Sequence, residues 1–484
     1  MSQVATPPAP PVAASRPLCV DLDGTLVKSD TLVDSLLVLA RSHPVQLIHL
    51  PAKLLQGKAA FKAFVTSQVA LDVVHLPYNR KLLQFLQEQK QEGRPIYLAT
   101  GADTRLAERV AAHLGIFTGV LGSDGAVNLT GTRKLDRLRE QLGGGEFDYV
   151  GNDTPDLPLF ACASEKMVAN PSFGLRAGLK RRHLSPSHSF IERDHTLLAL
   201  LRAVRLHQWA KNLLIFLPLL TSHRLQPVRM AHAVLAFLAF GLAASATYIV
   251  NDLLDIETDR RHPKKRLRPF ASGDLSAFAG AAIIAVFLAL ALGSCLLLPH
   301  KFSFWLMVYL ITTLTYTLYF KRLPLVDVLA LSGLYTLRLL VGGAATGIVI
   351  SHWLAAFSIF LFLSLAFVKR FAELENLRAS GNKPKNGRGY LLADMEQLRA
   401  FGTASAYAAV LVFALYINGR DVTRLYHHPS RLWFIVPMMI LWLSRMWLLA
   451  SRGELNEDPV LFAVTDRVSL LIGVAVAAAA LLAV

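Results

Sequence analysis

The sequence predicts two folds in one chain of 484 residues, a soluble α/β domain followed by an all-α bundle of membrane-spanning helices. The first observation is a split in composition: residues 1–200 hold polar loops and short apolar runs, whereas residues 205–484 hold long apolar runs. The second is an apolar content of 53%, which exceeds that of an ordinary soluble protein. The third is a series of short apolar strands that end in polar residues and alternate with helical stretches, as in a doubly wound sheet.

The N-terminus, the cysteines and the net charge indicate where the chain works. Residues 1–17 are rich in proline and alanine and lack a basic stretch before an apolar run, so we expect a disordered leader and no signal peptide. The three cysteines, Cys19, Cys162 and Cys295, have neither pairing nor metal-ligand spacing. The net charge of +16 in a membrane protein points to cytoplasmic loops and anionic lipid rather than nucleic acid.

The first predicted strands end in residues suited to phosphate chemistry. Asp21 and Asp23 follow an apolar strand, where one carboxylate can attack phosphorus and the other can protonate a leaving oxygen. Gly24 permits the tight bend that follows. Thr100 ends a second strand with a hydroxyl that can hold a phosphate oxygen, and Lys134 begins a helical stretch with a cation that can neutralise phosphate.

A third predicted strand ends in Asp153 and Asp156, which are oxygen ligands suited to Mg²⁺. Because a doubly wound sheet gathers the carboxyl ends of its strands, we expect all of these side chains to meet in one crevice. Residues 27–90 contain amphipathic helical stretches, and we expect them to form a cap that limits water and selects substrates. Residues 171–200, which contain Ser, Pro and a basic cluster, are expected to be a linker near the membrane surface.

Apolar segments predict about nine membrane-spanning helices in the second half. They lie near residues 212–222, 228–250, 275–298, 303–320, 325–348, 352–368, 401–418, 431–450 and 464–484. Loops after the even-numbered segments carry most of the basic residues, although the loop at 419–431 is basic too. The positive-inside rule therefore places the even-numbered loops and the soluble domain at the cytoplasmic face of an inner membrane.

Residues 251–259, Asn-Asp-Leu-Leu-Asp-Ile-Glu-Thr-Asp, directly follow the second apolar segment. A continuous helix would place Asp252, Asp255 and Asp259 on one face. Like charges on one stripe at a membrane surface repel each other, so we expect a divalent cation there, and an oxygen-only ligand set suits Mg²⁺. A dense basic stretch at 260–268 comes next, and carboxylates for a metal beside cations for phosphate predict a site for a diphosphate ester.

Three polar clusters in the predicted cytoplasmic loops are candidates for substrate binding. One surrounds the Asp motif, one precedes the first apolar segment, and one ends the sixth. Their candidate residues are Asn251, Lys264, Arg266, Arg205, Gln208, Lys211, Asn212, Lys369, Arg370 and Glu373. The third cluster has two interpretations, because a cation and Glu373 one helical turn apart can pair with each other or hold phosphate and metal.

Residues 18–170 resemble the haloacid dehalogenase superfamily of phosphohydrolases, because Asp-Leu-Asp-Gly-Thr and its companion motifs occur in that family's order. The resemblance implies that Asp21 is the nucleophile and Asp23 the general acid/base. The other motif residues would bind phosphate and Mg²⁺, namely Thr100 and Lys134 for the first and Asp153 with Asp156 for the second.

Residues 201–484 resemble the UbiA prenyltransferase superfamily, whose first aspartate-rich motif is filled by residues 251–259. The family's usual second aspartate-rich motif is replaced by the cluster at 369–373. The strings Arg-x-x-Gln-Trp-x-Lys-Asn at 205–212 and His-Pro-x-Lys-Arg-x-Arg-Pro at 262–269 are similar to the decaprenyl-phosphate phosphoribosyltransferase branch. That branch uses phosphoribosyl diphosphate as donor and a polyprenyl phosphate as acceptor.

Together the resemblances imply a Mg²⁺-dependent, bifunctional membrane enzyme. Its helical half would transfer 5-phosphoribose to a polyprenyl phosphate, and its fused phosphatase would remove the 5-phosphate of the product. Three alternatives stay open. The helical half transfers a prenyl group from a polyprenyl diphosphate to an aromatic acceptor, or it only binds lipid and anchors a phosphatase, or the soluble domain is regulatory and no longer catalyses.

Overall fold

The computed structural model describes residues 16–192, 196–379, 388–419, 422, 425–455 and 458–484. These residues divide into two compact units. The first comprises Met1–Val204 and Ile249–Ala282, and the second comprises Arg205–Tyr248 and Ile283–Val484. The Asp-rich motif, which the sequence places in the membrane half, therefore belongs to the same compact unit as the α/β domain.

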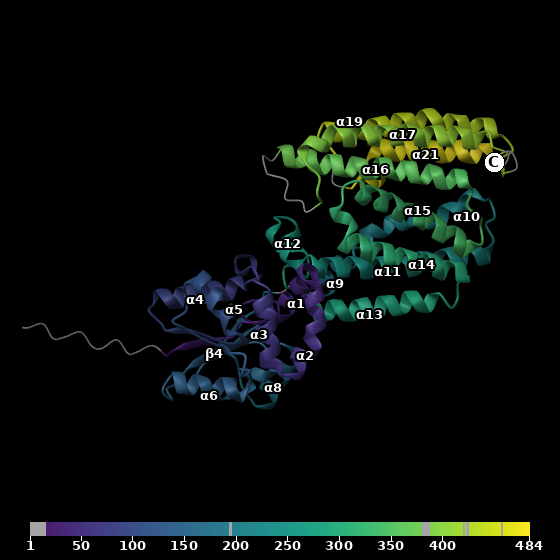
Figure 1. The fold of residues 1–484 in the computed structure, drawn as a ribbon. Helices are drawn as coiled ribbons and strands as arrows, with labels where there is room; N and C mark the ends of the chain where they lie inside the picture. The colour runs from purple at the N-terminus through teal and green to yellow at the C-terminus, as the bar shows by residue number, and fades with distance from the viewer. Residues whose placement is uncertain (1–15, 193–195, 380–387, 420–421, 423–424, 456–457) are drawn as a thin grey trace, which may run out of the picture. The chain divides into compact units, whose positions relative to one another are not determined.

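The first unit is built around a six-stranded sheet in which all neighbouring strands are parallel (Figure 1). The strand order β3-β2-β1-β4-β5-β6 leaves a switch point between β1 and β4, where a crevice forms in doubly wound sheets. The strands are β1 Leu18–Val20, β2 Ile96–Asp103, β3 Gly119–Ser123, β4 Asp148–Gly151, β5 Lys166–Ala169 and β6 His188–Phe190. The α-helices are α1 Thr31–Ser42, α2 Leu50–Leu55, α3 Lys58–Gln68, α4 Arg80–Gln91, α5 Thr104–Leu114, α6 Thr132–Gln141, α7 Leu157–Cys162, α8 Phe173–Arg181 and α9 Thr196–Val204. Short 3₁₀ turns are η1 Pro44–His49, η2 Val73–His75 and η3 Thr154–Asp156.

Alternate side chains of β1 enter two separate cores, one on each face of the sheet. Leu18 and Val20 pack with apolar residues of α4 and α5. Cys19 lies in the other core, with apolar residues of α6, α7 and α8. Figure 1 shows α4 and α5 on one face and α6 and α8 on the other. The two-residue period is that of a strand buried on both faces, and it places β1 at the centre of the unit.

The regions predicted as cap and linker both contain regular structure. Four helices, α1 to α4, connect β1 to β2 where the sequence predicts a helical cap. Residues 171–200, predicted to be a linker, instead contain α8 and β6, and β6 extends the sheet beside β5. Ser172 caps α8 by accepting a hydrogen bond from the Leu175 N–H at 3.1 Å. The elements are short and flanked by basic turns, which is why the composition of this stretch indicated a linker.

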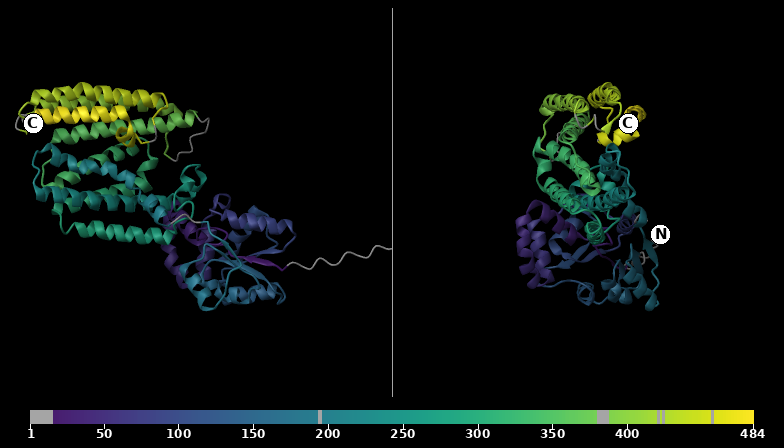
Figure 2. Two further views of the ribbon diagram at one scale, coloured as in Figure 1. Left: turned by 180° about the vertical axis from the view of Figure 1, so that it is seen from behind. Right: turned by 90° about the vertical axis from the view of Figure 1, so that its right-hand side faces the viewer.

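The second unit is helical, and the right-hand view of Figure 2 shows its long helices nearly end-on. Two of the long helices, α11 and α13, cross the boundaries between the two units. The α-helices from residue 217 onward are α10 Leu217–Thr221, α11 Pro227–Leu254, α12 Ile256–Arg261, α13 Ala277–Ser294, α14 His300–Leu318, α15 Val326–Thr346, α16 His352–Ala379, α17 Met395–Ile417, α19 Ile435–Ser451, α20 Pro459–Thr465 and α21 Arg467–Ala483. The 3₁₀ segments are η4 Leu206–Phe216, η5 Lys265–Leu267, η6 Phe320–Arg322, η7 Leu392–Asp394 and η8 Pro429–Phe434.

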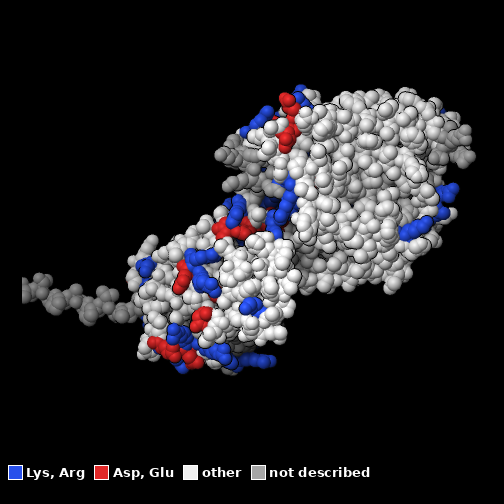
Figure 3. Space-filling model, in the orientation of Figure 1, with Lys and Arg blue, Asp and Glu red and all other residues white. Residues whose placement is uncertain are grey.

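Six helices in the described part of the chain are long and apolar enough to cross a membrane, or seven if the bent pair α20 and α21 forms one span. The predicted nine spans are therefore not confirmed. The segment near 212–222 is the end of η4 followed by the five-residue α10. The segment predicted near 303–320 corresponds to α14, His300–Leu318, which is helical but not among the six. In Figure 3 the visible side of this unit carries few charged residues, which lie near the helix ends, as expected of a surface in contact with lipid.

Candidate functional site

The carboxyl ends of β1 and β4 adjoin a cavity of about 300 Å³. Five predicted phosphatase residues line it, namely Asp21, Asp23, Lys134, Asp153 and Asp156. Gly24 forms the turn after β1 with a φ of +73°, and a Cβ at this position would lie 2.0 Å from the Asn152 side-chain nitrogen. Only glycine fits there, so Gly24 allows the tight turn after Asp21 and Asp23. The strand order places this turn beside the end of β4 at the cavity.

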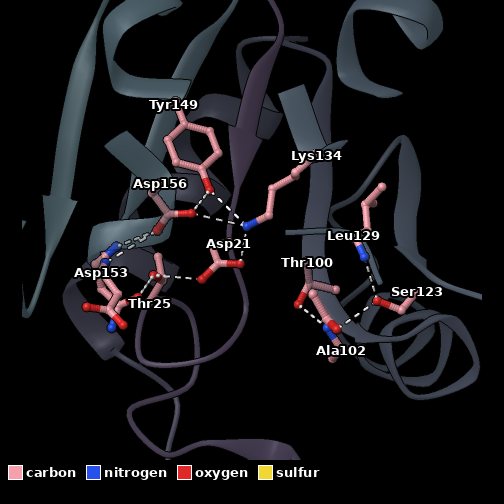
Figure 4. Close-up of polar contacts among 12 residues, drawn as sticks. Asp21, Thr25, Thr100, Ala102, Ser123, Leu129, Lys134, Tyr149, Asp153 and Asp156 are labelled. Atoms are coloured by element: carbon pink, nitrogen blue, oxygen red, sulfur yellow. Dashed lines mark hydrogen bonds and ion pairs between the residues drawn. The ribbon is translucent and has the colours of Figure 1, made fainter. Parts of the chain in front are cut away.

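Lys134 is the centre of a hydrogen-bonded network on one side of Asp21 (Figure 4). Its Nζ lies 2.9 Å from Asp21 Oδ1, 3.2 Å from Asp156 Oδ1 and 3.1 Å from the Tyr149 hydroxyl. Tyr149 in turn donates a hydrogen bond to Asp156 at 2.8 Å. Lys134 is only 3% exposed. Burial alone would lower its pKa, but Asp156 and Asp21 raise that pKa above its ordinary value, so the ammonium stays charged beside the predicted nucleophile.

Both carboxyls that follow β1 titrate closer to neutral pH than a free aspartate. Burial raises the pKa of Asp21 to about 6, against the opposing charge of Lys134. Burial and the neighbouring Asp30 raise the pKa of Asp23 to about 7, although the Thr31 N–H donates to its carboxylate at 2.7 Å. A carboxyl that exchanges its proton near neutral pH suits general acid/base catalysis.

The two carboxylates after β4 have different surroundings. Asp156 is buried and accepts hydrogen bonds from the backbone N–H groups of Asn152 and Asp153, at 3.3 and 3.4 Å, in addition to its bonds with Lys134. Asp153 accepts a hydrogen bond from the Ser172 hydroxyl at 2.7 Å. Asp156 thus holds the end of β4 and the lysine in position, which leaves Asp153 as the better candidate for a metal ligand.

The end of β2 contributes a backbone carbonyl and a hydroxyl. Thr100 is fully buried, its hydroxyl accepts a hydrogen bond from the Ala102 N–H at 3.0 Å, and the adjoining Gly101 lines the cavity. Lys62 of α3 also lines the cavity and donates to the Gly101 carbonyl at 2.6 Å and to Asn128 at 2.8 Å. Sequence reasoning did not single out Lys62, although it lies in the helical stretch predicted to be the cap.

The Asp-rich motif does not form the single stripe that a continuous helix predicts. α11 ends and α12 begins on either side of Asp255, so this residue lies at a break. The carboxylates of Asp252 and Asp259 converge on Arg268, whose Nη1 lies 3.0 and 2.6 Å from them. Asp255 pairs instead with Arg41 of α1. The break therefore separates the middle carboxylate from the other two.

The carboxylates of Asp252 and Asp259 are buried, and both pair with the positively charged Arg268. Burial raises the pKa of Asp259 to about 6, against Arg268, and the charge of Asp252 adds to the rise. Two such oxygen donors on one cation are chemically suited to Mg²⁺, although no group of three or more His, Cys, Asp or Glu side chains in the described residues is arranged to hold a metal ion. Asn251 is half-buried in the last turn of α11.

The segment after the motif is anchored to the α/β domain by contacts within the first unit. Arg260, 5% exposed, donates to the Asp34 carboxylate at 2.7 Å and to the Ser29 hydroxyl at 3.0 Å. Gly273 has a φ of +76°, and a Cβ there would lie 2.7 Å from the Cβ of Lys28. The buried ion pair and the close backbone approach hold this segment against the residues that follow β1.

In the second unit, the cluster at 205–212 is joined to polar residues from distant helices. Lys211 pairs with Asp458. Asn212 is buried and accepts a hydrogen bond from Arg338 Nε at 2.9 Å, and Arg338 also donates to the Leu334 carbonyl at 2.6 Å. Arg338 could have been found in the sequence, because a cation within an apolar segment needs a buried partner.

The residues of the cluster at 369–373, which ends the sixth apolar segment, have different surroundings. Arg370 is 1% exposed, donates to both oxygens of Glu373 at 2.8 Å and pairs with the fully buried Asp327. Arg388 donates to Glu373 at 2.9 Å. Arg370 and Glu373 thus form the ion pair that one of the two interpretations predicts. Lys369 is half-buried and makes no hydrogen bond or ion pair within the described residues.

The other predicted residues differ in exposure. Arg205 has a left-handed backbone, and its guanidinium lies 5.6 Å from the centre of the Tyr248 ring. Gln208 is half-buried in η4. Lys264 and Arg266 are exposed at η5. Arg261 of the same basic stretch is exposed as well, but it pairs with Asp72 and Glu257.

The apolar helices and the polar residues near their ends define a multi-pass membrane protein of the helical-bundle class. The UbiA prenyltransferase family matches residues 213–471, more than half of the chain, and the chain therefore belongs to that family.

Several known proteins are similar to this chain. The uncharacterized protein y4nM of Sinorhizobium fredii is 39% identical over 480 residues, covering 96% of this chain and 91% of that protein. The nodulation protein NoeC of Azorhizobium caulinodans is 36% identical over 56% of this chain and 88% of its own length. The decaprenyl-phosphate phosphoribosyltransferase of Mycobacterium tuberculosis is 31% identical over 57% of this chain and 90% of its own length. A UbiA homolog from Archaeoglobus fulgidus, solved with DMAPP and Mg²⁺, aligns with a TM-score of 0.45 and 19% identity over 58% of this chain and 98% of that chain.

Proposed function

We propose that the helical half transfers 5-phosphoribose from phosphoribosyl diphosphate to a polyprenyl phosphate at the cytoplasmic face of the inner membrane. The observation that carries this proposal is the pair of buried carboxylates, Asp252 and Asp259, that share one guanidinium after an apolar span. Similarity to a decaprenyl-phosphate phosphoribosyltransferase over 90% of its length supports ribosyl over prenyl transfer. The replacement of a second aspartate-rich motif by the cluster at 369–373 agrees with that choice.

Asp252 and Asp259, with Asp255 as a third ligand, would hold Mg²⁺ and so require Arg268 to move aside. Bound Mg²⁺ supplies positive charge for the departing diphosphate. The candidates for the donor's phosphates are Lys264, Arg266 and Lys369, which form no ion pair with a carboxylate within the described residues. Arg370 instead holds Asp327 and Glu373, and we assign it a structural role.

In the transfer, the bond between C1 of the ribose and the diphosphate oxygen breaks, and C1 gains oxocarbenium character. An oxygen of the polyprenyl phosphate then bonds to C1, and the diphosphate leaves with the electron pair of the broken bond. The attacking phosphate is already an anion, so no general base is required. The task of the protein is therefore to neutralise charge and to align donor and acceptor.

We also propose that the α/β domain is a phosphatase that removes the 5-phosphate from the lipid-linked product. The observation that carries this proposal is the carboxylate Asp21 beside the buried Lys134, with the near-neutral Asp23 in the same cavity. Mg²⁺ held by Asp21, Asp23 and Asp153 would neutralise the phosphoryl oxygens. The fusion keeps the phosphatase at a high effective concentration near the product.

In this reaction Asp21 attacks phosphorus, the ester P–O bond breaks, and Asp23 gives its proton to the leaving O5 of the ribose. Water then attacks the phosphorus of the aspartyl-phosphate and gives its proton to Asp23. Inorganic phosphate and the free Asp21 carboxylate are the products. The pKa of about 7 lets Asp23 act first as acid and then as base.

The transferase proposal is tested with purified protein, Mg²⁺, labelled phosphoribosyl diphosphate and polyprenyl phosphate. Labelled lipid is the expected product, and Asp252→Ala should abolish it. Glu257→Gln is the matched control, because Glu257 is a neighbouring carboxylate that pairs with Arg261 and not with Arg268. Normal turnover by Asp252→Ala would remove the Asp motif from the mechanism.

Two alternative functions give different products in a parallel reaction with polyprenyl diphosphate and 4-hydroxybenzoate. A prenylated benzoate would establish aromatic prenyl transfer, which the Asp motif serves equally well. Phosphatase activity with no transfer in either reaction would establish an anchored phosphatase. The buried carboxylate pair argues against simple anchoring, because lipid binding alone does not require buried charge.

A further inference from the structure

The wall of the phosphatase-like cavity combines charged and apolar side chains. The residues that follow β1 and β4 supply charged side chains, as described above. A second set comes from the Asp-rich motif and the segment that follows it. Its apolar members are Ile256, Phe270, Leu275, Ala277 and Phe278, and Ser276 is its polar member. The cavity is therefore charged where phosphate would react and apolar where the remainder of a substrate would lie.

The apolar wall is held in place by the contacts of its own segment. Ile256 and Phe270 are 2% and 1% exposed, so they are packed parts of the first unit. The Arg260–Asp34 ion pair fixes one end of the segment. Arg41 adds hydrogen bonds to the Leu254 carbonyl at 3.2 Å and the Thr258 hydroxyl at 3.1 Å. The wall is thus a fixed feature of the cavity.

The same wall continues into a predicted membrane span. Ala277 and Phe278 are the first two residues of α13, which is apolar enough to cross a membrane. Only 11% of the apolar window of α13 is buried inside the protein, and Phe278 is 70% exposed. An apolar helix with so little protein cover faces lipid, so the cavity ends where a lipid-facing surface begins.

We propose that this cavity selects phosphate monoesters that are linked to a membrane isoprenoid lipid. The phosphate would lie at Asp21 and Lys134, and the first part of the lipid would lie against Leu275 and Phe278. A soluble sugar phosphate would leave the exposed Phe278 ring in water, whereas a lipid-linked ester covers it and gains the corresponding free energy. This inference rests on the proposed phosphatase function and adds the residues by which the cavity distinguishes a lipid-linked phosphate monoester from a soluble one.

The test compares two synthetic substrates with the same head group in the same detergent, the polyprenyl and the methyl esters of phosphoribose 5-phosphate. The wild-type protein should prefer the polyprenyl ester, measured as phosphate release. Phe278→Asp should reduce kcat/KM for the polyprenyl ester about tenfold more than for the methyl ester, because burial of one phenyl ring is lost. Phe278→Leu should keep most of the preference.

Phe173→Asp is the matched control, because Phe173 is 89% exposed on α8 and does not line the cavity. It should leave the ratio of the two rates unchanged. Equal rates for both esters in the wild type would overturn the lipid selectivity and leave the phosphatase intact. An equal loss for both esters in Phe278→Asp would also overturn it, since Phe278 would then only support the fold. A wild type that hydrolyses neither ester would remove the phosphatase function and this inference with it.

Discussion

The carboxylates that line the cavity and those of the Asp-rich motif lie in the same compact unit, but they are arranged differently. The first group meets at one place, whereas the second is divided between two arginines. In the cavity, carboxylates from separate strand ends meet around Lys134. In the Asp-rich motif, which is continuous in sequence, Asp255 separates from Asp252 and Asp259. In this protein, the sheet topology brings together carboxylates that are far apart in sequence, whereas a spacing of three or four residues does not keep the carboxylates of the Asp-rich motif together.

The two groups of carboxylates differ because different backbone structures position them. The parallel ladder of β2, β1 and β4 fixes where each strand ends, so the side chains that follow must emerge at one edge. A helix end has no such ladder. At Asp255 the backbone has a φ of −92° and a ψ of 6°, which is sufficient to end one helix and begin another. The cations Arg41 and Arg268 then select which carboxylates stay together.

The largest effect that separates the two regions is expected from Asp21→Asn. Loss of the proposed nucleophile should reduce the proposed phosphatase activity by about 1000-fold or more, while the proposed ribosyl transfer continues. Mass spectrometry of the lipid products should therefore show accumulation of the 5-phosphorylated form. Asp124→Asn is the control, because Asp124 is exposed and only accepts hydrogen bonds from the Ala126 and Val127 N–H groups. An unchanged product distribution in Asp21→Asn would refute the coupling of the two reactions.

The cavity could be predicted largely from the sequence, because each motif follows an apolar strand and the order of strands and helices fixes the topology. Lys62 could not, because a lysine in an amphipathic helix is ordinarily a solvated residue. The pairing of Asp34 with Arg260 joins positions far apart in the chain. Asp34 lies in no motif, and Arg260 lies in the basic stretch that the sequence assigns to phosphate. Local patterns contain no information on such partners.

The helical half was less predictable for a related reason. Counting apolar residues gave nine spans, but it does not detect where η4 and α10 interrupt a segment. The cluster at 369–373 left two interpretations open, and the decisive residue is Asp327, which lies in a different apolar segment from Arg370. A buried carboxylate in an apolar segment is a usable signal, but the sequence does not say which cation it meets.

Arg370→Met and Lys369→Met test which of these two adjacent cations stabilises the fold and which binds substrate. Arg370→Met should lower the free energy of unfolding by about 3–5 kcal/mol, because the fully buried Asp327 loses its partner. Lys369→Met should change stability by less than about 1 kcal/mol but raise the KM for phosphoribosyl diphosphate. Thermal unfolding in a fixed detergent and donor titration measure the two effects. The reverse order of stabilities would show that Lys369 is the structural residue.

Asp34→Asn tests the anchor of the Asp-rich segment. It removes one charge from a buried ion pair, so we expect a loss of about 2 kcal/mol in the free energy of unfolding, together with slower ribosyl transfer. Glu140→Gln is the control, because the Arg137–Glu140 pair is 60% and 66% exposed and such pairs contribute little. Normal transfer by a destabilised Asp34→Asn protein would mean that the anchor supports the fold without positioning the motif.

The smallest effect is expected in the chemical labelling of Cys19, which tests whether β1 stays paired with its neighbouring strands in the folded protein. Cys19 is fully buried in β1, and burial, with a further contribution from Asp148, raises the pKa of its thiol to about 12. A raised pKa lowers the thiolate fraction at neutral pH, and the thiolate is the reactive form. In a Cys295→Ser background, a maleimide at pH 7 should therefore label the exposed Cys162 and leave Cys19 unmodified until the protein is denatured. If Cys19 reacts as fast as Cys162 in the folded protein, β1 opens readily, and the ladder cannot be what gathers the carboxylates of the cavity.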